Sequence, residues 1–466
     1  MTASLIEWLR TSESPLPEGV RALRRGVAKA HAVATHRSIP AFMDSVVATV
    51  PPPRRSGSGS GRSARRIVEV STYPLHPRQT GGQLRGWHLA EALTHDADTE
   101  VSILSLTTDP SFAGHRQLAP RLSETCVAIP PDQSARETAL RLVTGNVSIT
   151  DIAAGLMWNG LGSFATELDD RLDGATAAVL VQPYLVDAVN SLAPSIAVVC
   201  DEHNDELALK RSILPGNSGG RWLLARVDEL EQRAVEGAAL VTATTDDDLD
   251  ALDARYRIDA PSAIVPNGVD TTEIEFITGD DRGRRKRELS VMIGLGGHRP
   301  TALFVGSGHR PNIDAGRDII EVAHRLPHVD FLLAGRHSTL LHVPHAPSNV
   351  HLLGVVPGDL LDLLLTGCDV ALNPMHAGSG SNLKLLTYLA AGIPVVSTGV
   401  GARGIDAASA AVHIADEDDL AGGITRVLSG LDPVDSLAGR QYVEEHCDWR
   451  AIGRRFAALV AEHLHS

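Results

Sequence analysis

Cysteine is scarce in this chain, and its spacing gives no sign of a zinc knuckle or a disulfide framework. The four cysteines lie far apart, without any CxxC pair, at positions Cys126, Cys200, Cys368 and Cys447. Isolated cysteines of this kind suit a reducing compartment. Aromatic residues are also few, at 4% of the 466 residues, so the cores must be built mainly from Ala, Val, Leu and Ile.

Long apolar runs are absent as well. No run reaches the roughly 20 residues that a transmembrane helix needs, and the N-terminus lacks the apolar region of a signal peptide. We therefore expect a cytoplasmic protein. Hydrophobic residues make up 43% of the chain, which suits a globular protein, and its length predicts two domains with extensions.

Basic residues are fewer than acidic residues over the whole chain, but they outnumber them at its start. The formal net charge is −15, yet residues 1–70 contain 11 Lys and Arg against 5 Asp and Glu. An acidic body disfavours nonspecific binding to nucleic acid, so we expect no nucleic-acid partner. The basic N-terminal arm predicts a peripheral contact with the inner face of an anionic membrane. The alternative is a solvated arm without a partner.

Proline, glycine and serine help to divide the chain into five segments. Residues 1–50 are predicted to form an N-terminal helical extension, and residues 51–65 a flexible linker. An N-terminal Rossmann-like domain over 66–264 and a C-terminal one over 265–445 follow, and a helix over 446–466 ends the chain. The predicted fold class is α/β, with two Rossmann-like parallel-sheet domains facing across a cleft.

Short apolar runs alternate with amphipathic stretches in both domains, which is the order of a parallel sheet with right-handed crossovers. The predicted strands are 67–70, 101–106, 178–181, 196–199 and 240–243 in the first domain, and 302–305, 331–334, 350–353, 370–372 and 394–397 in the second. Residues 280–287 are interpreted as an exposed charged segment. Because ligands of open parallel sheets bind beyond the carboxyl ends of the strands, the loops there are the candidate sites.

The most informative loop joins the strand that ends at Asn373 to the next helix through a run of small residues. Its members are Gly378, Ser379, Gly380, Ser381 and Asn382. Such residues let the backbone approach a ligand closely, and the free N–H groups at a helix start favour anions, particularly phosphate. Lys384 adds a positive charge in the first turn. The alternative is a plain tight connection, but a turn alone does not need so many small residues.

Three further loops carry weaker signals. Gly81 and Gly82 follow the first strand and precede a helix, so the same anion logic applies there. Gly306 and Arg310 follow a strand of the second domain, where Arg310 could neutralise a pyrophosphate or simply be a surface residue. His203 follows the strand over 196–199, where it could polarise or contact a sugar hydroxyl, or belong to a loop of capping residues.

Two motifs are set aside. Residues 399–404 fit GxGxxG after a strand, but no clear helix follows and the motif lies late in its domain, so a nicotinamide site is disfavoured. Residues 246–248 contain a DxD sequence of the kind that metal-dependent sugar transferases use. Acidic residues in a first helical turn are explained by the helix dipole, so we expect no metal there.

Several pieces recur in the order of a known family. They are the Gly81-Gly82 loop, His203-Asn204, the turn VPNGVD at 265–270, FVGS at 304–307, NVHLLG at 349–354, and the run from Gly378 to Thr398. Together they resemble the retaining glycosyltransferases of family 4 (group 1), which have the GT-B fold. The resemblance covers residues 66–466, and its C-terminal half is the more specific.

The resemblance implies a hexosyl- or related glycosyltransferase (EC 2.4) that moves a sugar from a UDP- or GDP-sugar to a glycan or glycoconjugate acceptor, with retention. It implies a donor held mainly by the C-terminal domain, an acceptor on the N-terminal domain, and neither a cofactor nor a metal. Positive groups and helix N-termini would then stabilise the leaving pyrophosphate. Gly81 and Gly82 would lie near the donor phosphates, His203 near the transferred sugar, and Lys384 in the donor helix. A role in polysaccharide biosynthesis is expected.

One departure from the family pattern affects the prediction. The family often has two glutamates eight positions apart in this loop and helix, one for the sugar and one for the ribose. The matching residues are Ser379 and Thr387, and neither is acidic. A hydroxyl still bonds ribose, but more weakly than a carboxylate. The alternatives are therefore a catalytically weakened GT-B protein that binds a nucleotide-sugar, or another GT-B chemistry such as an epimerase or phosphorylase.

Overall fold

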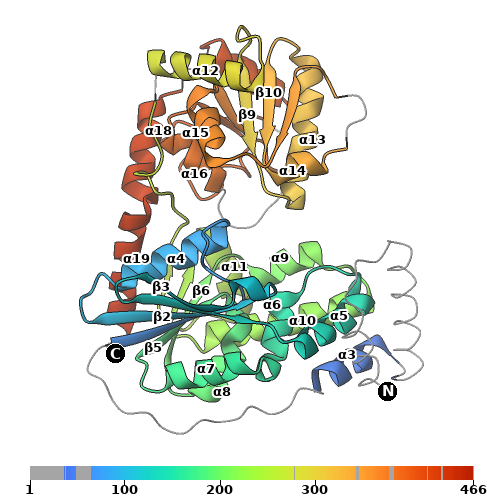
Figure 1. Cartoon of the computed structure of the whole chain (residues 1–466), viewed down its shortest axis with the longest axis vertical. Helices are drawn as coiled ribbons and strands as arrows, with labels where there is room; N and C mark the ends of the chain where they lie inside the picture. Colours follow the sequence, from blue (N-terminus) through green and yellow to red (C-terminus); the bar gives the residue numbers. More distant parts are fainter. Residues whose placement is uncertain are drawn as a thin grey trace. The chain divides into compact units, whose positions relative to one another are not determined.

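Two mostly parallel sheets organise the chain, as the sequence predicts. The computed structural model describes residues 36, 38–48, 65–277, 279–342, 346–376, 383–416, 418–431 and 434–464. The chain divides into a first unit, Met1–Val265 with Gly453–Ser466, and a second unit, Pro266–Ile452 (Figure 1). Most of the predicted N-terminal extension and linker lies outside the described residues. Helix α3 (Ile39–Ala48) is described, and it packs inside the first unit against two of its longer helices.

The first unit is built on an eight-stranded sheet in the order β3-β4-β2-β1-β5-β6-β7-β8. Its strands are β1 (Arg65–Ser71), β2 (Thr99–Thr107), β3 (Gly114–Ala119), β4 (Leu122–Ala128), β5 (Ala177–Val181), β6 (Ala197–Glu202), β7 (Leu240–Ala243) and β8 (Ser262–Ile264). All neighbours pair in parallel except β3 and β4. Strand β1 lies centrally, with Ile67 opposite both Val101 and Ala177, which explains its apolar sequence.

Helices cover both faces of this sheet. They are α4 (Gly81–Leu93), α5 (Pro131–Thr144), α6 (Thr150–Leu156), α7 (Ser163–Leu172), α8 (Val186–Leu192), α9 (Glu206–Ile213), α10 (Ser218–Glu236) and α11 (Asp246–Tyr256). Helices α7 and α8 lie on one face, whereas α4 lies on the other (Figure 1). The largest core cluster joins α3, α5, α6, α7, α8 and α10 to the strands, and it is built mainly from aliphatic side chains.

The second unit is built on a six-stranded, fully parallel sheet in the order β11-β10-β9-β12-β13-β14. Its strands are β9 (Thr301–Val305), β10 (Asp330–Ala334), β11 (Val350–Gly354), β12 (Val370–Asn373), β13 (Val395–Ser397) and β14 (His413–Ile414). Its helices are α12 (Gly279–Ile293), α13 (Arg310–Arg325), α14 (Arg336–Leu340), α15 (Gly358–Gly367), α16 (Leu383–Ala390), α17 (Leu420–Leu428) and α18 (Ser436–Tyr442).

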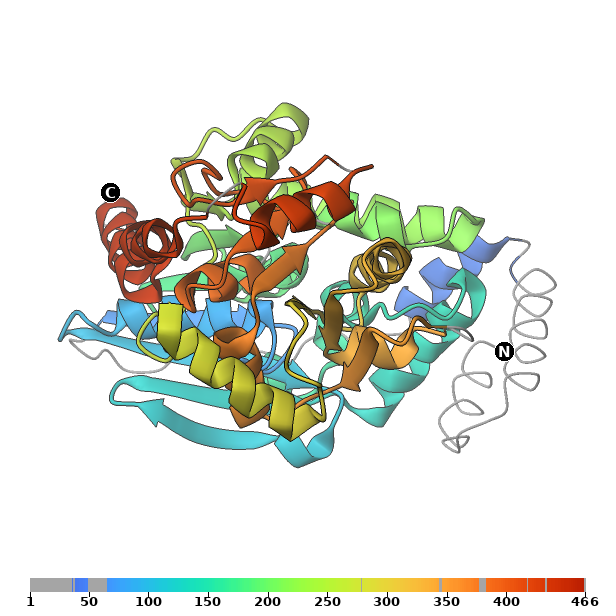
Figure 2. The ribbon, with the colours of Figure 1, turned by 90° about the horizontal axis from the view of Figure 1, so that it is seen from above.

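The prediction of an exposed charged segment over 280–287 needs correction, because the segment is helical and one of its arginines is buried. These residues belong to α12, which packs against α15, and Figure 2 shows α12 in yellow as a continuous helix. Arg282 is buried and donates hydrogen bonds to the carbonyls of Ile277, Leu365, Cys368 and Ala391. The run of charged residues suggested an exposed segment. A guanidinium can nevertheless be buried when backbone oxygens accept its hydrogen bonds.

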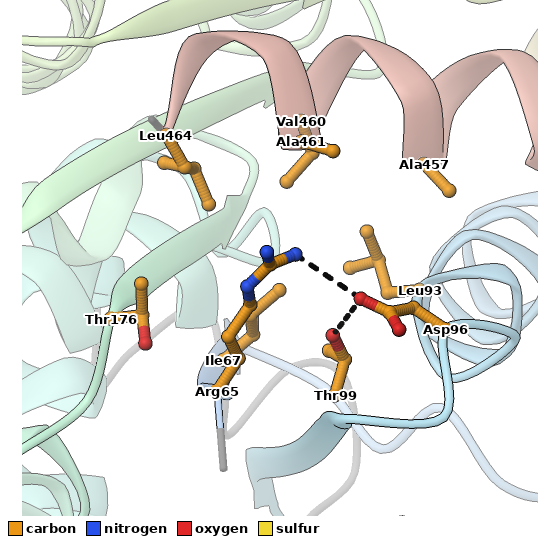
Figure 3. Close-up of a pocket in the computed structure, with 10 residues that line it drawn as sticks. All are labelled: Arg65, Ile67, Leu93, Asp96, Thr99, Thr176, Ala457, Val460, Ala461 and Leu464. Carbon is orange, nitrogen blue, oxygen red and sulfur yellow. Dashed lines mark hydrogen bonds and ion pairs between the residues drawn. The ribbon is translucent and has the colours of Figure 1, made fainter. Parts of the chain in front are cut away.

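The last helix, α19 (Trp449–His463), starts in the second unit and ends in the first. Phe456 and Val460 on this helix are buried. Figure 3 shows its last turns above a small pocket at the amino-terminal ends of β1 and β2, where Arg65 pairs with Asp96 at 3.1 Å. The predicted C-terminal helix is thus present, but its packing on the first unit was not predicted.

None of the helices that the structure describes has both the length and the apolar character that crossing a membrane requires.

Candidate functional site

In the first unit, the structure brings Gly82 and His203 together at the carboxyl ends of β1 and β6. A Cβ atom on Gly82 would lie 2.5 Å from the Tyr73 hydroxyl and 3.5 Å from His203 Nδ1. Glycine is therefore needed at position 82 because a larger side chain would collide with Tyr73, and not because of its backbone conformation. Gly81 is the first residue of α4, whose N-terminus is capped by Thr80 and Gln83 in a capping box.

His203 is buried and held at both ring nitrogens. Its Nε2 lies 3.1 Å from Asp201 Oδ2, and its Nδ1 lies 3.4 Å from the Tyr73 hydroxyl. Because the ionised carboxylate of Asp201 can only accept a hydrogen bond, it holds a proton on Nε2 of His203. Nδ1 is directed toward the Tyr73 hydroxyl.

Asp201 is the centre of this network. Arg85 on α4 is fully buried and forks onto both carboxylate oxygens, at 2.9 and 2.5 Å. The Thr242 hydroxyl on β7 donates to the same carboxylate at 2.6 Å. Burial alone would raise the pKa of Asp201, but the positive charge of Arg85 and the hydrogen bond with His203 hold it well below its usual range.

Two further carboxyls are buried on strands of this sheet, Glu124 on β4 and Glu69 on β1. Glu124 accepts hydrogen bonds from the backbone N–H of Leu75 at 2.8 Å and of His76 at 3.2 Å, so it holds the loop that carries Tyr73. Glu69 is buried below α4, and burial raises its pKa well above the usual range, with added repulsion from Asp201 and Glu124. Burial therefore favours the neutral, protonated form of Glu69.

In the second unit, Gly306 follows β9 and makes room for two side chains. A Cβ atom there would lie 2.8 Å from His337 Nδ1 and 3.1 Å from Asn312 Cβ. The Gly306 carbonyl oxygen lies 2.9 Å from Nδ1 of His337, which is fully buried on α14. Close packing against His337 and Asn312 therefore explains why this position is a glycine.

Lys384 lies in the first turn of α16, next to this cluster. Its Nζ is 2.5 Å from Asn312 Oδ1 and 3.4 Å from Met375 Sδ, and it sits 4.8 Å from the centre of the Phe304 ring. Burial lowers the pKa of Lys384 to about 7. Asn312 Nδ2 in turn donates to the Ser307 hydroxyl at 3.1 Å.

The structure does not bring two other predicted donor residues into this cluster. Arg310 begins α13 with an exposed side chain that pairs with Asp314 at 2.8 Å. The Thr387 hydroxyl donates to the Leu383 carbonyl of its own helix at 3.2 Å. The predicted loop residues Gly378, Ser379, Gly380, Ser381 and Asn382 lie outside the described residues.

The two motifs that were set aside have structural explanations. Thr245 caps α11, and Asp248 accepts a hydrogen bond from the Thr245 hydroxyl at 2.6 Å. Residues 399–404 form turns, and the next helix, α17, begins only at Leu420. Within the described ranges, no three His, Cys, Asp or Glu side chains gather in a way that could hold a metal ion.

Tyr73, Arg85 and Asp201 had no assigned role in the sequence prediction. Arg85 and Asp201 are separated by 116 residues, so no local pattern links them. The only local signal was the position of Asp201 near the end of β6, two residues before His203.

Comparison with known proteins identifies a family over part of the second unit. Residues 299–430 match the family described as "Glycosyl transferases group 1". A sequence search against curated proteins found no match.

Similar solved structures cover most of the chain at low sequence identity. Sucrose-phosphate synthase from Thermosynechococcus elongatus has a TM-score of 0.64 and 15% identity, over 85% of this chain and 99% of that one. Anabaena HepE in complex with UDP-glucose has a TM-score of 0.56 and 12% identity, over 85% and 99%. WaaG, a glycosyltransferase involved in lipopolysaccharide biosynthesis, has a TM-score of 0.57 and 15% identity, over 84% and 99%. Residues 299–430 therefore form a group 1 glycosyltransferase domain, and the chain is a glycosyltransferase with the GT-B fold.

Proposed function

We propose that the protein transfers a sugar from a UDP- or GDP-sugar to a glycan or glycoconjugate acceptor, with retention of configuration, as a member of family 4. The observation that carries the proposal is Lys384. This lysine lies in the first turn of α16, and the described contacts of its ammonium group are all to neutral groups. A partly buried cation at a helix N-terminus is suited to an anionic ligand such as a diphosphate. The complex of Anabaena HepE with UDP-glucose supports a nucleotide-sugar as that ligand.

The proposed chemistry needs the leaving diphosphate to be stabilised as the sugar bond breaks. Lys384 and the amides that begin α16 supply positive charge and hydrogen-bond donors for the developing negative charge. His203 is proposed to contact the transferred sugar. Its orientation is fixed in advance by Asp201, so no rearrangement of the ring is needed when the sugar binds.

A second function is favoured by one specific observation. The Thr387 hydroxyl, at the position proposed for ribose, donates its hydrogen bond within its own helix. It therefore offers ribose only acceptor capacity, where a glutamate would offer a charged carboxylate. This favours the alternative of a catalytically weakened protein that binds a nucleotide-sugar.

The test is to incubate the full chain with a panel of UDP- and GDP-sugars and to follow nucleotide release, with and without glycan acceptors. Release of UDP or GDP, with a product whose anomeric configuration matches the donor by NMR, supports transfer with retention. An inverted product rejects retention alone. Binding without release supports the second function, and the absence of both across the panel rejects the nucleotide-sugar proposal.

The cellular setting is also a proposal: a cytoplasmic enzyme of polysaccharide biosynthesis that contacts the inner face of the membrane through the basic residues before Arg65. The similarity to WaaG supports a glycan or glycolipid acceptor. Removal of residues 1–64 should abolish binding to vesicles that contain anionic lipid. Unchanged binding would reject the role of the arm.

A further inference from the structure

The described surroundings of Lys384 contain no carboxylate contact. Its described contacts are the Asn312 side-chain oxygen, the Met375 sulfur and the face of the Phe304 ring. All three are neutral groups. Removing an ammonium group from water without an opposite charge is costly, so this position favours the arrival of an anion.

The other titratable groups on the surrounding elements do not supply that charge. On α14, His337 is buried, and burial together with the charge of Lys384 lowers its pKa, so it is neutral at pH 7. On α13, the helix of Asn312, the Asp318 carboxylate pairs with His376 at 3.0 Å, and that of Asp314 pairs with Arg310. His337 Nε2 is also buried without a hydrogen-bond partner in the described structure, so one polar group beside Lys384 is unsatisfied.

Asn312 has a defined orientation. Its amide nitrogen donates to the Ser307 hydroxyl at 3.1 Å, and this contact turns the amide oxygen toward Lys384 at 2.5 Å. The oxygen of a neutral amide can hold the ammonium group in place without cancelling its charge. An aspartate at the same position would form an internal ion pair instead.

We propose that Asn312 is a positioning residue that holds Lys384 ready for the donor diphosphate, and that its neutrality leaves the donor to supply the opposite charge. This inference rests on the proposed function and adds to it a residue outside the donor loop. It also predicts a pH dependence. The diphosphate stabilises the charged form of Lys384, so binding is accompanied by proton uptake where the free lysine is partly neutral.

The sign of the pH effect follows from the position of Lys384. In the free protein its pKa is about 7, so well below pH 7 the lysine is already charged and its titration no longer changes the affinity. Above pH 7 each bound diphosphate must also bring a proton. Affinity for the nucleotide then falls by up to tenfold per pH unit, until the pH passes the raised pKa of the complex.

The experiment is titration calorimetry of the full chain with UDP and with GDP between pH 6 and 9, in two buffers of different ionisation enthalpy. The difference between buffers gives the number of protons taken up. The variants are Asn312→Ala and the nearly isosteric Asn312→Asp. Glu321→Ala is the matched control, because Glu321 is an exposed residue on the same helix.

We expect the unmodified chain and the control to bind alike, with proton uptake rising above pH 7. Asn312→Ala should weaken binding about tenfold, the size of one lost hydrogen bond to a charged group. Asn312→Asp should weaken binding at least as much and remove the proton uptake, since its carboxylate keeps Lys384 charged. If Asn312→Ala fails to fold, Asn312→Asp decides the result.

The outcomes separate the two proposals. Unchanged affinity and unchanged proton uptake in the Asn312 variants would overturn this inference and leave the proposed function in place. No binding of any nucleotide or nucleotide-sugar by the unmodified chain would reject the proposed function, and this inference with it.

Discussion

The buried pair of Arg85 and Asp201 provides the sharpest stability prediction. Replacement of Asp201 by Asn keeps the shape of the side chain but leaves the guanidinium of Arg85 buried without its opposite charge. Both side chains are at most 2% exposed. Loss of one partner of a buried ion pair costs about 3–5 kcal/mol, against a total stability of about 5–15 kcal/mol for a domain.

A matched control exists in the same unit. Arg233 and Asp187 form the same forked contact, at 2.8 and 2.9 Å, but with side chains that are 44% and 35% exposed. An exposed pair contributes about 0–1 kcal/mol, because water already solvates both charges. Asp187→Asn should therefore leave the free energy of unfolding almost unchanged.

The assay is urea unfolding of both variants at pH 7, followed by circular dichroism and tryptophan fluorescence. The low pKa of Asp201 also predicts the effect of acid on the unmodified chain. The carboxylate contributes its full stability above pH 4, the usual range of an unfolded aspartate, and this contribution is lost as the pH falls toward its native pKa. Equal losses of unfolding free energy in Asp201→Asn and Asp187→Asn would refute this reasoning.

Three further outcomes are expected. Gly82→Ala should reduce sugar transfer at least tenfold, because its Cβ would press on the Tyr73 hydroxyl at 2.5 Å, and adding Tyr73→Phe should restore part of the rate. No recovery in the double variant would assign the loss to another contact. Phe456→Ala should lower the free energy of unfolding by about 3–5 kcal/mol, since this side chain is fully buried, whereas Leu437→Ala at an exposed site should change it by less than about 0.5 kcal/mol. We propose that transfer needs no metal, so the rate should stay unchanged in EDTA; loss in EDTA and recovery on adding Mg²⁺ or Mn²⁺ would contradict that proposal.

Much of the sheet architecture could be predicted from the sequence. All ten predicted strands overlap strands of the structure, because parallel strands buried on both faces are continuous apolar runs. The hairpin of β3 and β4 was not predicted. Strand β3, GHRQLA, lies at the exposed edge of the sheet, so it lacks an apolar signal.

Contacts between distant parts of the chain could not be predicted. The end of α19 packs on the first unit, although the helix follows directly on the second, and its amphipathic sequence does not say which surface it covers. In the candidate site, the rule that ligands bind at the carboxyl ends of strands selected the loops of Gly82 and His203, but not the close approach between them. The contacts of Asp201 with Arg85, and of Asn312 with Lys384, join residues far apart in sequence and needed the folded chain.

The central claim is that Lys384 at the start of α16 binds the donor diphosphate. The most direct measurement is the melting temperature of the full chain and of Lys384→Met, with and without a panel of UDP- and GDP-sugars. Without ligand, Lys384→Met should melt at the same or a higher temperature, because it removes a cation that has only neutral described contacts. With donor at about 100 times Kd, the unmodified chain should gain about 2.7 kcal/mol and melt several degrees higher, and Lys384→Met should gain little. An equal rise in both proteins would contradict the account.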